Sequence, residues 1–389
     1  MSAIDEQMPS ALAGGAERPP TALPVTAEIV SGREWDATVA GFDEVCQEQL
    51  FTFATTRWPG TVQEPVIFRL GGEIVGGTLM MIQPLPLRLA SIAVSKWGPM
   101  LKDAHRPDAA AMHAGMVEAL IADYAQRRGM MLSVLPRASI EAQNGRYRQL
   151  IARGFRPGSI LLFPNRYIVN LRLDDAALRK SFAQKWRYHL NKSEKEGLSF
   201  EHADISRTGA FHSLYKAMTD RKQFADHSAY ETVDALMTME PASLRPELFF
   251  VRDESGIVAG AIVFTAGDRA VYLYGATNDR ALPLRAGYFL HWHVIRWLRD
   301  NTPARWYDLG GTDGYQGLHQ FKKGMVGEAG VIRPVPPVAN YAAKPLPFLV
   351  GQGAFAARDA YHAVQRAIHA WRNPDRRPDQ ERASSGEGP

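Results

Sequence analysis

Apolar and polar positions follow the same order in the two halves of the chain. Residues 66–77 (VIFRLGGEIVGG) and residues 249–260 (FFVRDESGIVAG) each predict a hairpin, in which two apolar strands flank a turn of glycine or polar residues. In each half another strand follows and ends near a glycine. After it come a helix, expected at 108–128 and at 285–300, and a further strand. This shared order predicts an internal repeat.

The elements of each repeat also predict a class of fold. Meander strands followed by a helix and a parallel strand form the core of acetyltransferase-like (GNAT) domains. We therefore expect an α/β (α+β) protein with tandem acetyltransferase-like domains, whose mixed sheets are flanked by helices. The expected divisions are a disordered segment 1–24, a first domain 25–165, a second domain 166–345, a C-terminal helix 346–372 and a disordered tail 373–389.

A basic helix is expected between the repeats, over residues 174–197, beginning at an Asp pair and ending at Gly197. Apolar residues recur at every fourth position and predict one face packed on protein: Leu178, Phe182, Trp186 and Leu190. The remaining surface carries positive charge: Arg179, Lys180, Lys185, Arg187, Lys192 and Lys195. Such a surface either attracts phosphates or is the solvated face of an amphipathic helix.

A glycine-rich loop with lysines is expected over residues 310–324, within the sequence WYDLGGTDGYQGLHQFKKG. Its glycines let the main chain approach a ligand closely, because they carry no side chain. Lys322 and Lys323 offer donors to phosphates or to a developing oxyanion; the alternative is a surface loop with solvated lysines. Asp308 and Asp313 flank the loop, where each either accepts a proton from an amine or serves in a turn.

Composition and motifs exclude several classes of function. The chain has 389 residues and a formal net charge of +4, which is too mild to indicate nucleic-acid binding by charge alone. The single cysteine, Cys46, excludes a disulfide framework and favours a reducing, cytoplasmic location. His291 and His293 point to different faces of one helix, so no metal site is expected. Nucleophile-elbow, zinc-protease, Walker and dinucleotide motifs are absent from the sequence.

Three segments carry a family resemblance: FAQKWRYHLNKSEKEGLSF, YGATNDRALPLRAGYFLHWHVIRW and YDLGGTDGYQGLHQFKKG. In order and spacing, from about residue 45 to about residue 340, the chain resembles the Fem-type (FemABX) peptidoglycan peptidyltransferases. The resemblance implies transfer of an amino acid from aminoacyl-tRNA to an amine of a lipid-linked or UDP-linked muropeptide, in cell-wall synthesis and the maintenance of cell shape. Aminoacyl-tRNA would be the co-substrate, with no resident cofactor.

The same resemblance implies roles for single residues. Its most specific element matches Gly317, Leu318, Phe321, Lys322 and Gly324, and it implies that Lys322 is catalytic and neutralises charge at the acyl centre. Phe321, and Lys323 beside it in the lysine pair, are expected to bind substrate.

Further substrate-binding positions are expected outside this element. Arg221 stands where the family holds a diphosphate, although it also fits a solvated helix arginine. Tyr272 and Tyr274 alternate on one strand, so both are expected on the same side, lining the acceptor groove or packing in the core. The chain departs from the family at Met325 and Val326, where Phe-Gly is usual.

Two other functions fit the sequence. Arg285 and Gly287 are expected at a helix start, where backbone N–H groups receive a pyrophosphate, as in an acyl-CoA N-acyltransferase. A non-catalytic module that binds an anionic glycolipid or RNA through the basic helix and the loop is the third interpretation. In addition, residues 354–372 predict a helix that either lies on the inner membrane face or packs on the second repeat.

Overall fold

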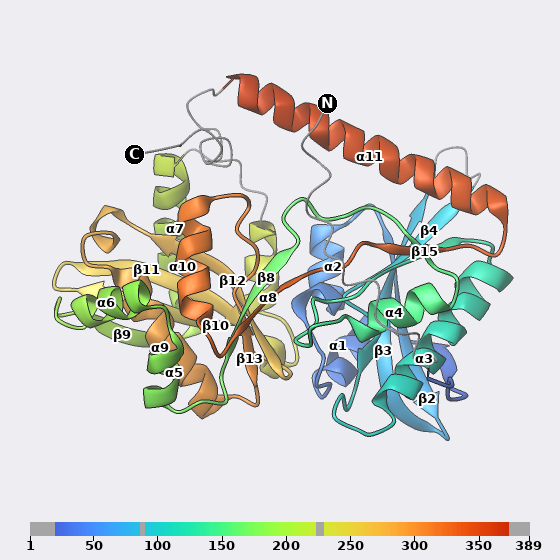
Figure 1. Ribbon diagram of the computed structural model, residues 1–389, viewed down its shortest axis with the longest axis horizontal. Helices are drawn as coiled ribbons and strands as arrows, with labels where there is room; N and C mark the ends of the chain where they lie inside the picture. Colours follow the sequence, from blue (N-terminus) through green and yellow to red (C-terminus); the bar gives the residue numbers. More distant parts are fainter. Residues whose placement is uncertain (1–19, 86–89, 223–228, 373–389) are drawn as a thin grey trace, which may run out of the picture.

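The computed structural model describes residues 20–85, 90–222 and 229–372 (Figure 1). Most of the expected N-terminal segment 1–24 and the whole tail 373–389 lie outside the described residues. Residues 20–24 differ from the expectation, because they pack on the first domain. The backbone N–H of Leu23 donates to Ala111 O at 3.2 Å, and a Cβ on Gly115 would lie 2.2 Å from Leu23 O.

The first domain is built on a mixed sheet in the order β1-β2-β3-β4-β6-β15-β7, with β5 paired to β3. All its neighbours are antiparallel except β4 and β6, which are parallel. Its strands are β1 (Thr26–Ile29), β2 (Val62–Leu70), β3 (Glu73–Pro84), β4 (Ser91–Lys96), β5 (Met100–Leu101), β6 (Met131–Leu135), β7 (Arg156–Pro157) and β15 (Ala339–Tyr341).

The second domain repeats this sheet in the order β9-β10-β11-β12-β13-β8-β14, again with one parallel pair, β12 and β13. The repeat expected from the sequence is therefore confirmed, including both hairpins. The strands are β8 (Asn165–Asn170), β9 (Ser199–Ala203), β10 (Glu247–Asp253), β11 (Gly256–Phe264), β12 (Arg269–Thr277), β13 (Trp306–Asp308) and β14 (Val331–Pro334).

The two domains exchange strands. β8 follows the first domain in sequence but lies in the second sheet, between β13 and β14. β15 follows the second domain but lies in the first sheet, at the equivalent place between β6 and β7. The expected end of the second domain at residue 345 thus differs from the structure, because residues 339–341 complete the first sheet.

Helices cover both faces of each sheet, and Figure 1 shows the two domains side by side. The interface contains an apolar cluster, in which Phe264 and Val271 of the second sheet pack with Trp35 and Phe53 of the first domain. The expected helices 108–128 and 285–300 are confirmed, the former as α3 followed by a π-helical stretch, Ile121–Arg127. The helices are α1 (Gly32–Val39), α2 (Phe51–Arg57), α3 (Ala109–Leu120), α4 (Gly145–Ala152), α5 (Asp175–Ser181), α6 (Gln184–Ser193), α7 (Thr208–Lys222), α8 (Val233–Met237), α9 (Ala286–Asn301), α10 (Gln316–Val326) and α11 (Pro345–Arg372).

The basic segment 174–197 forms two helices, α5 and α6, rather than the single expected helix. Phe182 and Ala183 are extended between them, and the N–H of Ala183 donates to Gly324 O of α10 at 2.9 Å. Tertiary pairing with α10 therefore interrupts a locally favourable helix. The predicted apolar stripe is buried as expected, with Leu178, Phe182, Trp186 and Leu190 in one core cluster.

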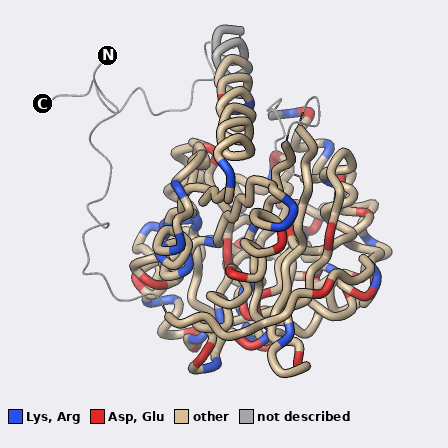
Figure 2. The backbone as a smooth tube through the Cα atoms, turned by 90° about the vertical axis from the view of Figure 1, so that its right-hand side faces the viewer, with Lys and Arg blue, Asp and Glu red and all other residues tan. Residues whose placement is uncertain are grey.

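The C-terminal helix α11 begins at Pro345 and packs on the first domain, not on the second repeat. Its residues Phe348 and Phe355 contact a small cluster formed by Leu85, Ile92 and Met131. Figure 2 shows that the rest of α11 rises away from the body of the protein. Within the described residues, no helix combines the length and the apolar character that crossing a lipid bilayer requires.

Candidate functional site

The candidate site lies where two parallel strands of the second sheet diverge. β12 and β13 pair only over Arg269–Val271 and Trp306–Asp308. β12 then continues to Thr277, whereas the chain after β13 turns into the loop Leu309–Tyr315 and enters α10. The divergence opens the sheet beside a glycine loop, at the carboxyl end of its one parallel pair.

The glycine loop is shorter than expected. It ends at Tyr315, because α10 begins at Gln316, so both lysines lie on a helix rather than in the loop. Successive helical residues point about 100° apart. Accordingly Lys322 is buried and Lys323 is exposed, which separates the two side chains that the sequence grouped together.

Lys322 holds the loop from the inside. Its Nζ donates to Leu309 O at 2.6 Å and to Gly311 O at 2.5 Å, so two of its three N–H groups are used within the described structure. Burial, aided by the positive charge of Arg166, lowers the pKa of this ammonium to about 8, while Asp313 and Asp308 act in the opposite direction. A cation of this kind is already desolvated, which increases its interaction with any charge that develops nearby.

Asp308 fixes the base of the same loop. Its carboxylate accepts a hydrogen bond from the Gly310 N–H at 2.9 Å and pairs with Arg166 of β8 at 3.1 Å. Burial alone would raise the pKa of Asp308, but Arg166 and Arg269 outweigh it and the pKa is lowered. Asp308 is therefore an ionised anchor of the turn, in agreement with the turn role expected for it.

A hollow of about 520 Å³ adjoins the loop. Its walls are Leu162 to Asn165 before β8, Tyr167 of β8, and the loop and first turn of α10. Tyr167 and His319 meet at this wall, with 2.5 Å between the hydroxyl oxygen and Nδ1. Sequence reasoning missed this pair. His319 lies three positions before Lys322 on the same helix, a spacing that places both on one face and was the available signal.

Aromatic side chains gather behind the loop. Phe321 of α10 packs 4.9 Å from Tyr288, 5.6 Å from His291 and 6.2 Å from Trp186, measured between ring centroids. Burial lowers the pKa of His291 to about 3, with the charge of Lys322 as a further cause, so this histidine is neutral in the core. The expected core role of His291 is consistent with this environment, and Phe321 joins the helices α6, α9 and α10.

The two tyrosines of β12 face opposite sides of the sheet, contrary to expectation. A β-bulge shifts the register: Tyr272 pairs with Val263 and Tyr274 with Ile262, which leaves Leu273 without a partner across the strands. Tyr272 consequently packs against His291 at 4.9 Å. Tyr274 lies on the α7 side, where its hydroxyl donates to Ala229 O at 2.6 Å. Only Tyr272 shares the face that carries Lys322.

The two expected substrate-binding arginines are engaged with the protein. Arg221 of α7 forms an ion pair with Asp279 and donates to Thr277 O at 3.1 Å. Arg285, left-handed at φ 54°, is the N-cap of α9 as expected, and its Nε donates to His189 Nδ1 at 3.3 Å. Ligand binding at either arginine would require exchange of these partners.

Two further side chains, Arg57 and Cys46, lie between the domains. Arg57 of α2 pairs with Glu231 of the second domain at 2.5 Å. Cys46 lines a cavity of about 10 Å³ with Arg166 and Asp308, and burial raises the pKa of its thiol to about 12. A thiol of this kind is not a nucleophile at neutral pH. Among the described residues, no cluster of three His, Cys, Asp or Glu side chains is suited to hold a metal ion.

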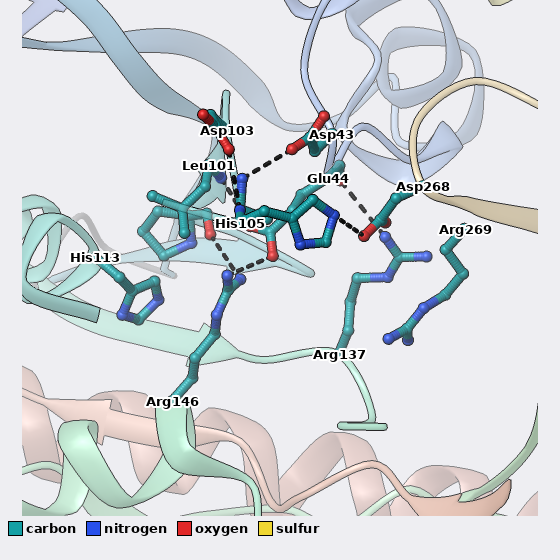
Figure 3. A network of polar contacts seen from close by, with 12 residues as sticks. Asp43, Glu44, Leu101, Asp103, His105, His113, Arg137, Arg146, Asp268 and Arg269 are labelled. Carbon is teal, nitrogen blue, oxygen red and sulfur yellow. Dashed lines mark hydrogen bonds and ion pairs between the residues drawn. The ribbon is translucent and has the colours of Figure 1, made fainter. Parts of the chain in front are cut away.

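Figure 3 shows a polar network of the first domain that reaches Asp268 and Arg269 of the second domain. In α4, the counterpart of α10, Arg146 pairs with Glu44, whose carboxylate also accepts from the Leu101 N–H at 2.7 Å. His113 of α3 lies beside this pair and contacts Gln149 of α4 at 3.1 Å. An internal carboxylate, Glu44, is therefore the ionic partner of α4 in the first domain.

Comparisons with known proteins agree with this architecture. Residues 180–323 match the acetyltransferase (GNAT) domain family. The structure of FemX is similar over 82% of this chain and 97% of its own, with a TM-score of 0.64 and 17% identity. L-PGS from Bacillus licheniformis is similar over 85% of this chain and 96% of its own, at TM-score 0.50 and 14% identity.

A third similar structure is the C-terminal domain of a putative lysylphosphatidylglycerol synthetase from Agrobacterium fabrum. It covers 83% of this chain and 96% of its own, at TM-score 0.50 and 11% identity. No curated protein sequence matches the chain. At these identities the solved structures support the fold, and the domain match supports a transferase of the acyl or aminoacyl class. The expected tandem GNAT fold is thereby confirmed, and the similarity to FemX is one of fold.

Proposed function

We propose that this protein transfers an aminoacyl group from aminoacyl-tRNA to an amine of a peptidoglycan precursor in the cytoplasm. One observation carries the proposal: a buried ammonium, Lys322, lies under a glycine loop that forms one wall of a polar hollow containing His319 and Tyr167. The resemblance of three segments to Fem-type enzymes and the similarity of fold to FemX support this choice of donor and acceptor.

The arrangement suits attack of an amine on an ester. The amine nitrogen forms a bond to the carbonyl carbon, and the carbonyl oxygen becomes an oxyanion, which the third N–H of Lys322 would stabilise. The bond from carbon to the ribose oxygen then breaks. His319 would accept the proton of the amine, with Tyr167 holding the imidazole, and return it to the ribose oxygen that leaves. No covalent enzyme intermediate is required, in keeping with the buried, protonated Cys46.

An acyl-CoA donor is the second candidate, and one observation favours it. The N–H of Gly287 lies in the first turn of α9, is partly exposed, and within the described structure does not donate to a backbone carbonyl. Such a donor at a helix N-terminus suits a pyrophosphate. Gly287 also borders Phe321, 3.8 Å from where a Cβ would stand, so the two ends of the site are adjacent.

A transfer assay distinguishes these donors. Purified protein is incubated with a muropeptide precursor and either radiolabelled aminoacyl-tRNAs or labelled acyl-CoA esters, with Lys322→Met as the inactive control. Label that arrives from tRNA, and fails to arrive with the variant, is the expected result. Label from acyl-CoA alone would replace the first proposal by the second. Binding of precursor without transfer from either donor would favour a non-catalytic binding module.

A further inference from the structure

Exposed large apolar side chains gather on one region of the protein. Of thirteen such residues in the described part of the chain, eight lie on three segments. These are the loop before β8, the glycine loop and α11, with Ile160, Leu161, Leu162, Tyr315, Leu346, Leu349, Tyr361 and Val364. Single exposed apolar residues are ordinary, whereas a group of this size indicates an interaction surface.

These segments belong to one surface. Ser159 Oγ donates to Asp359 Oδ2 at 2.6 Å and so ties the loop before β8 to α11. The same loop and the glycine loop meet at the hollow, since Leu162 and Tyr315 both line it. The apolar surface therefore runs from the rim of the candidate site to the C-terminal helix.

The outer face of α11 is apolar along its described length. Phe348 and Phe355 point inward, while Leu346, Leu349 and Val364 lie together on the opposite side and are exposed. Between Leu349 and Val364 that side carries small residues, all exposed: Gly353, Ala356, Ala357, Ala360 and Ala363. A helix of 28 residues is about 42 Å long. Its second half has no buried residue among those described and rises from the body of the protein (Figure 2).

The charge near this surface indicates which kind of partner binds to it. From Arg333 to Arg372 the sequence has five basic residues, Arg333, Lys344, Arg358, Arg366 and Arg372, and one acidic residue, Asp359. An apolar helix face flanked by basic residues binds the interface of anionic membranes, where apolar side chains enter the acyl boundary and cations remain at the headgroups. A second copy of this chain would bring the same positive charge, so like charges would oppose each other across such an interface.

We propose that the loop 159–162 and the outer face of α11 form a peripheral membrane-docking surface for anionic phospholipid. Docking through these segments sets the rim of the hollow against the headgroup layer. The inference goes beyond the proposed transfer reaction and does not depend on it, because docking is measured without donor or acceptor.

The test is sedimentation of the full-length protein with vesicles of phosphatidylcholine mixed with phosphatidylglycerol, and with vesicles of phosphatidylcholine alone. We expect binding to the mixed vesicles that weakens as salt is raised. The variants Ile160→Ser/Leu161→Ser and Leu349→Ser/Val364→Ser should each weaken this binding by about tenfold or more, since each removes two inserted apolar side chains.

A matched control variant tests whether the loss of binding is specific to this surface. Ile29→Ser/Val62→Ser removes two residues of equal exposure, 56% and 54%, from the edge of the first sheet, and should bind vesicles like the unaltered protein. Circular dichroism establishes that each variant is folded. Absence of binding to anionic vesicles, an equal loss in the control variant, or a dimer in light scattering that the α11 variant dissociates would each overturn the proposal.

Discussion

Replacing Lys322 by Met separates a catalytic role of this ammonium from a structural one. Methionine has a similar length and carries no charge. A pKa lowered from 10.5 to about 8 means that the charged form is destabilised by about 3 kcal/mol, which the substitution relieves. Against this, Leu309 O and Gly311 O lose their donor, at about 1–3 kcal/mol each. These terms nearly cancel, so we expect the free energy of unfolding to change by less than about 2 kcal/mol.

Turnover should respond far more strongly. Loss of one donor to an oxyanion costs about a hundredfold in kcat, or about 2.7 kcal/mol of transition-state stabilisation. The pH dependence has a definite sign, because the ammonium is lost as pH rises through about 8. The kcat of the unaltered protein divided by that of Lys322→Met should therefore fall about tenfold for each pH unit above about 8. Deprotonation of the acceptor amine affects both proteins equally, so it does not change this ratio.

Stability gives an independent check on the same pKa. Between about pH 8 and 10.5 the unfolded chain binds the proton of Lys322 more tightly than the folded protein does. Stability therefore rises by up to about 3 kcal/mol as pH increases through this window, and Lys322→Met should lack that rise. Urea unfolding at several pH values measures it. A variant that is folded and turns over normally would refute the catalytic role, and a kcat ratio that is constant from pH 7 to 9 would refute the need for the ammonium.

Three further predictions concern the surroundings of Lys322. Tyr167→Phe removes the partner of His319 and should lower kcat by about tenfold or more while altering its pH profile, with Tyr188→Phe, an exposed tyrosine, as the control. Asp308→Asn leaves the partly buried Arg166 without its partner and should lower the free energy of unfolding by about 3 kcal/mol, measured by urea unfolding. Because the pKa of Asp308 is lowered, its contribution to stability is present above about pH 4 and is lost as pH falls through its pKa in the folded protein. The difference in free energy of unfolding between the unaltered protein and Asp308→Asn should therefore disappear at acidic pH. Gly327→Ala places a Cβ 2.1 Å from Ser181 O at φ 59° and should cost about 3 kcal/mol, whereas Gly209→Ala, in open space on α7, should be neutral or stabilising; equal effects would contradict the contact.

Local pattern was sufficient to predict the repeat and much of its interior. The hairpins at residues 66–77 and 249–260 and the stripe from Leu178 to Leu190 depend on alternation and turn chemistry over a few residues, which the sequence carries directly. The exchange of β8 and β15 could not be predicted from such local patterns. Strands of six and three residues gain a partner only when the whole sheet exists. Nothing in their own sequence tells which of two equivalent sheets they join.

The candidate site was predictable at Lys322 and not at its partners. The glycine and lysine pattern identified the helix, but Tyr167 lies 152 positions from His319 and meets it only through the exchanged strand β8. The bulge that turns Tyr272 away from Tyr274 arises where β12 meets β11, so alternation along β12 alone gave the wrong side for one of them. Tertiary pairing likewise broke the expected basic helix at Phe182.

The two halves differ in how their buried charges are paired, and this difference bears on where the proposed reaction would take place. Both domains have the same sheet and the same helix after the parallel strand, so the fold alone would permit two sites. In the first domain, Glu44 accepts from the Leu101 N–H and pairs with Arg146, so a carboxylate of the chain already satisfies the cation and the donor there. In the second domain the corresponding helix presents Lys322, whose partners are neutral carbonyls. A cation whose hydrogen-bond partners are carbonyl dipoles retains more attraction for an incoming negative charge than a cation in a direct ion pair does. The repeat therefore gives one half that is internally neutralised and one that is poised for an oxyanion.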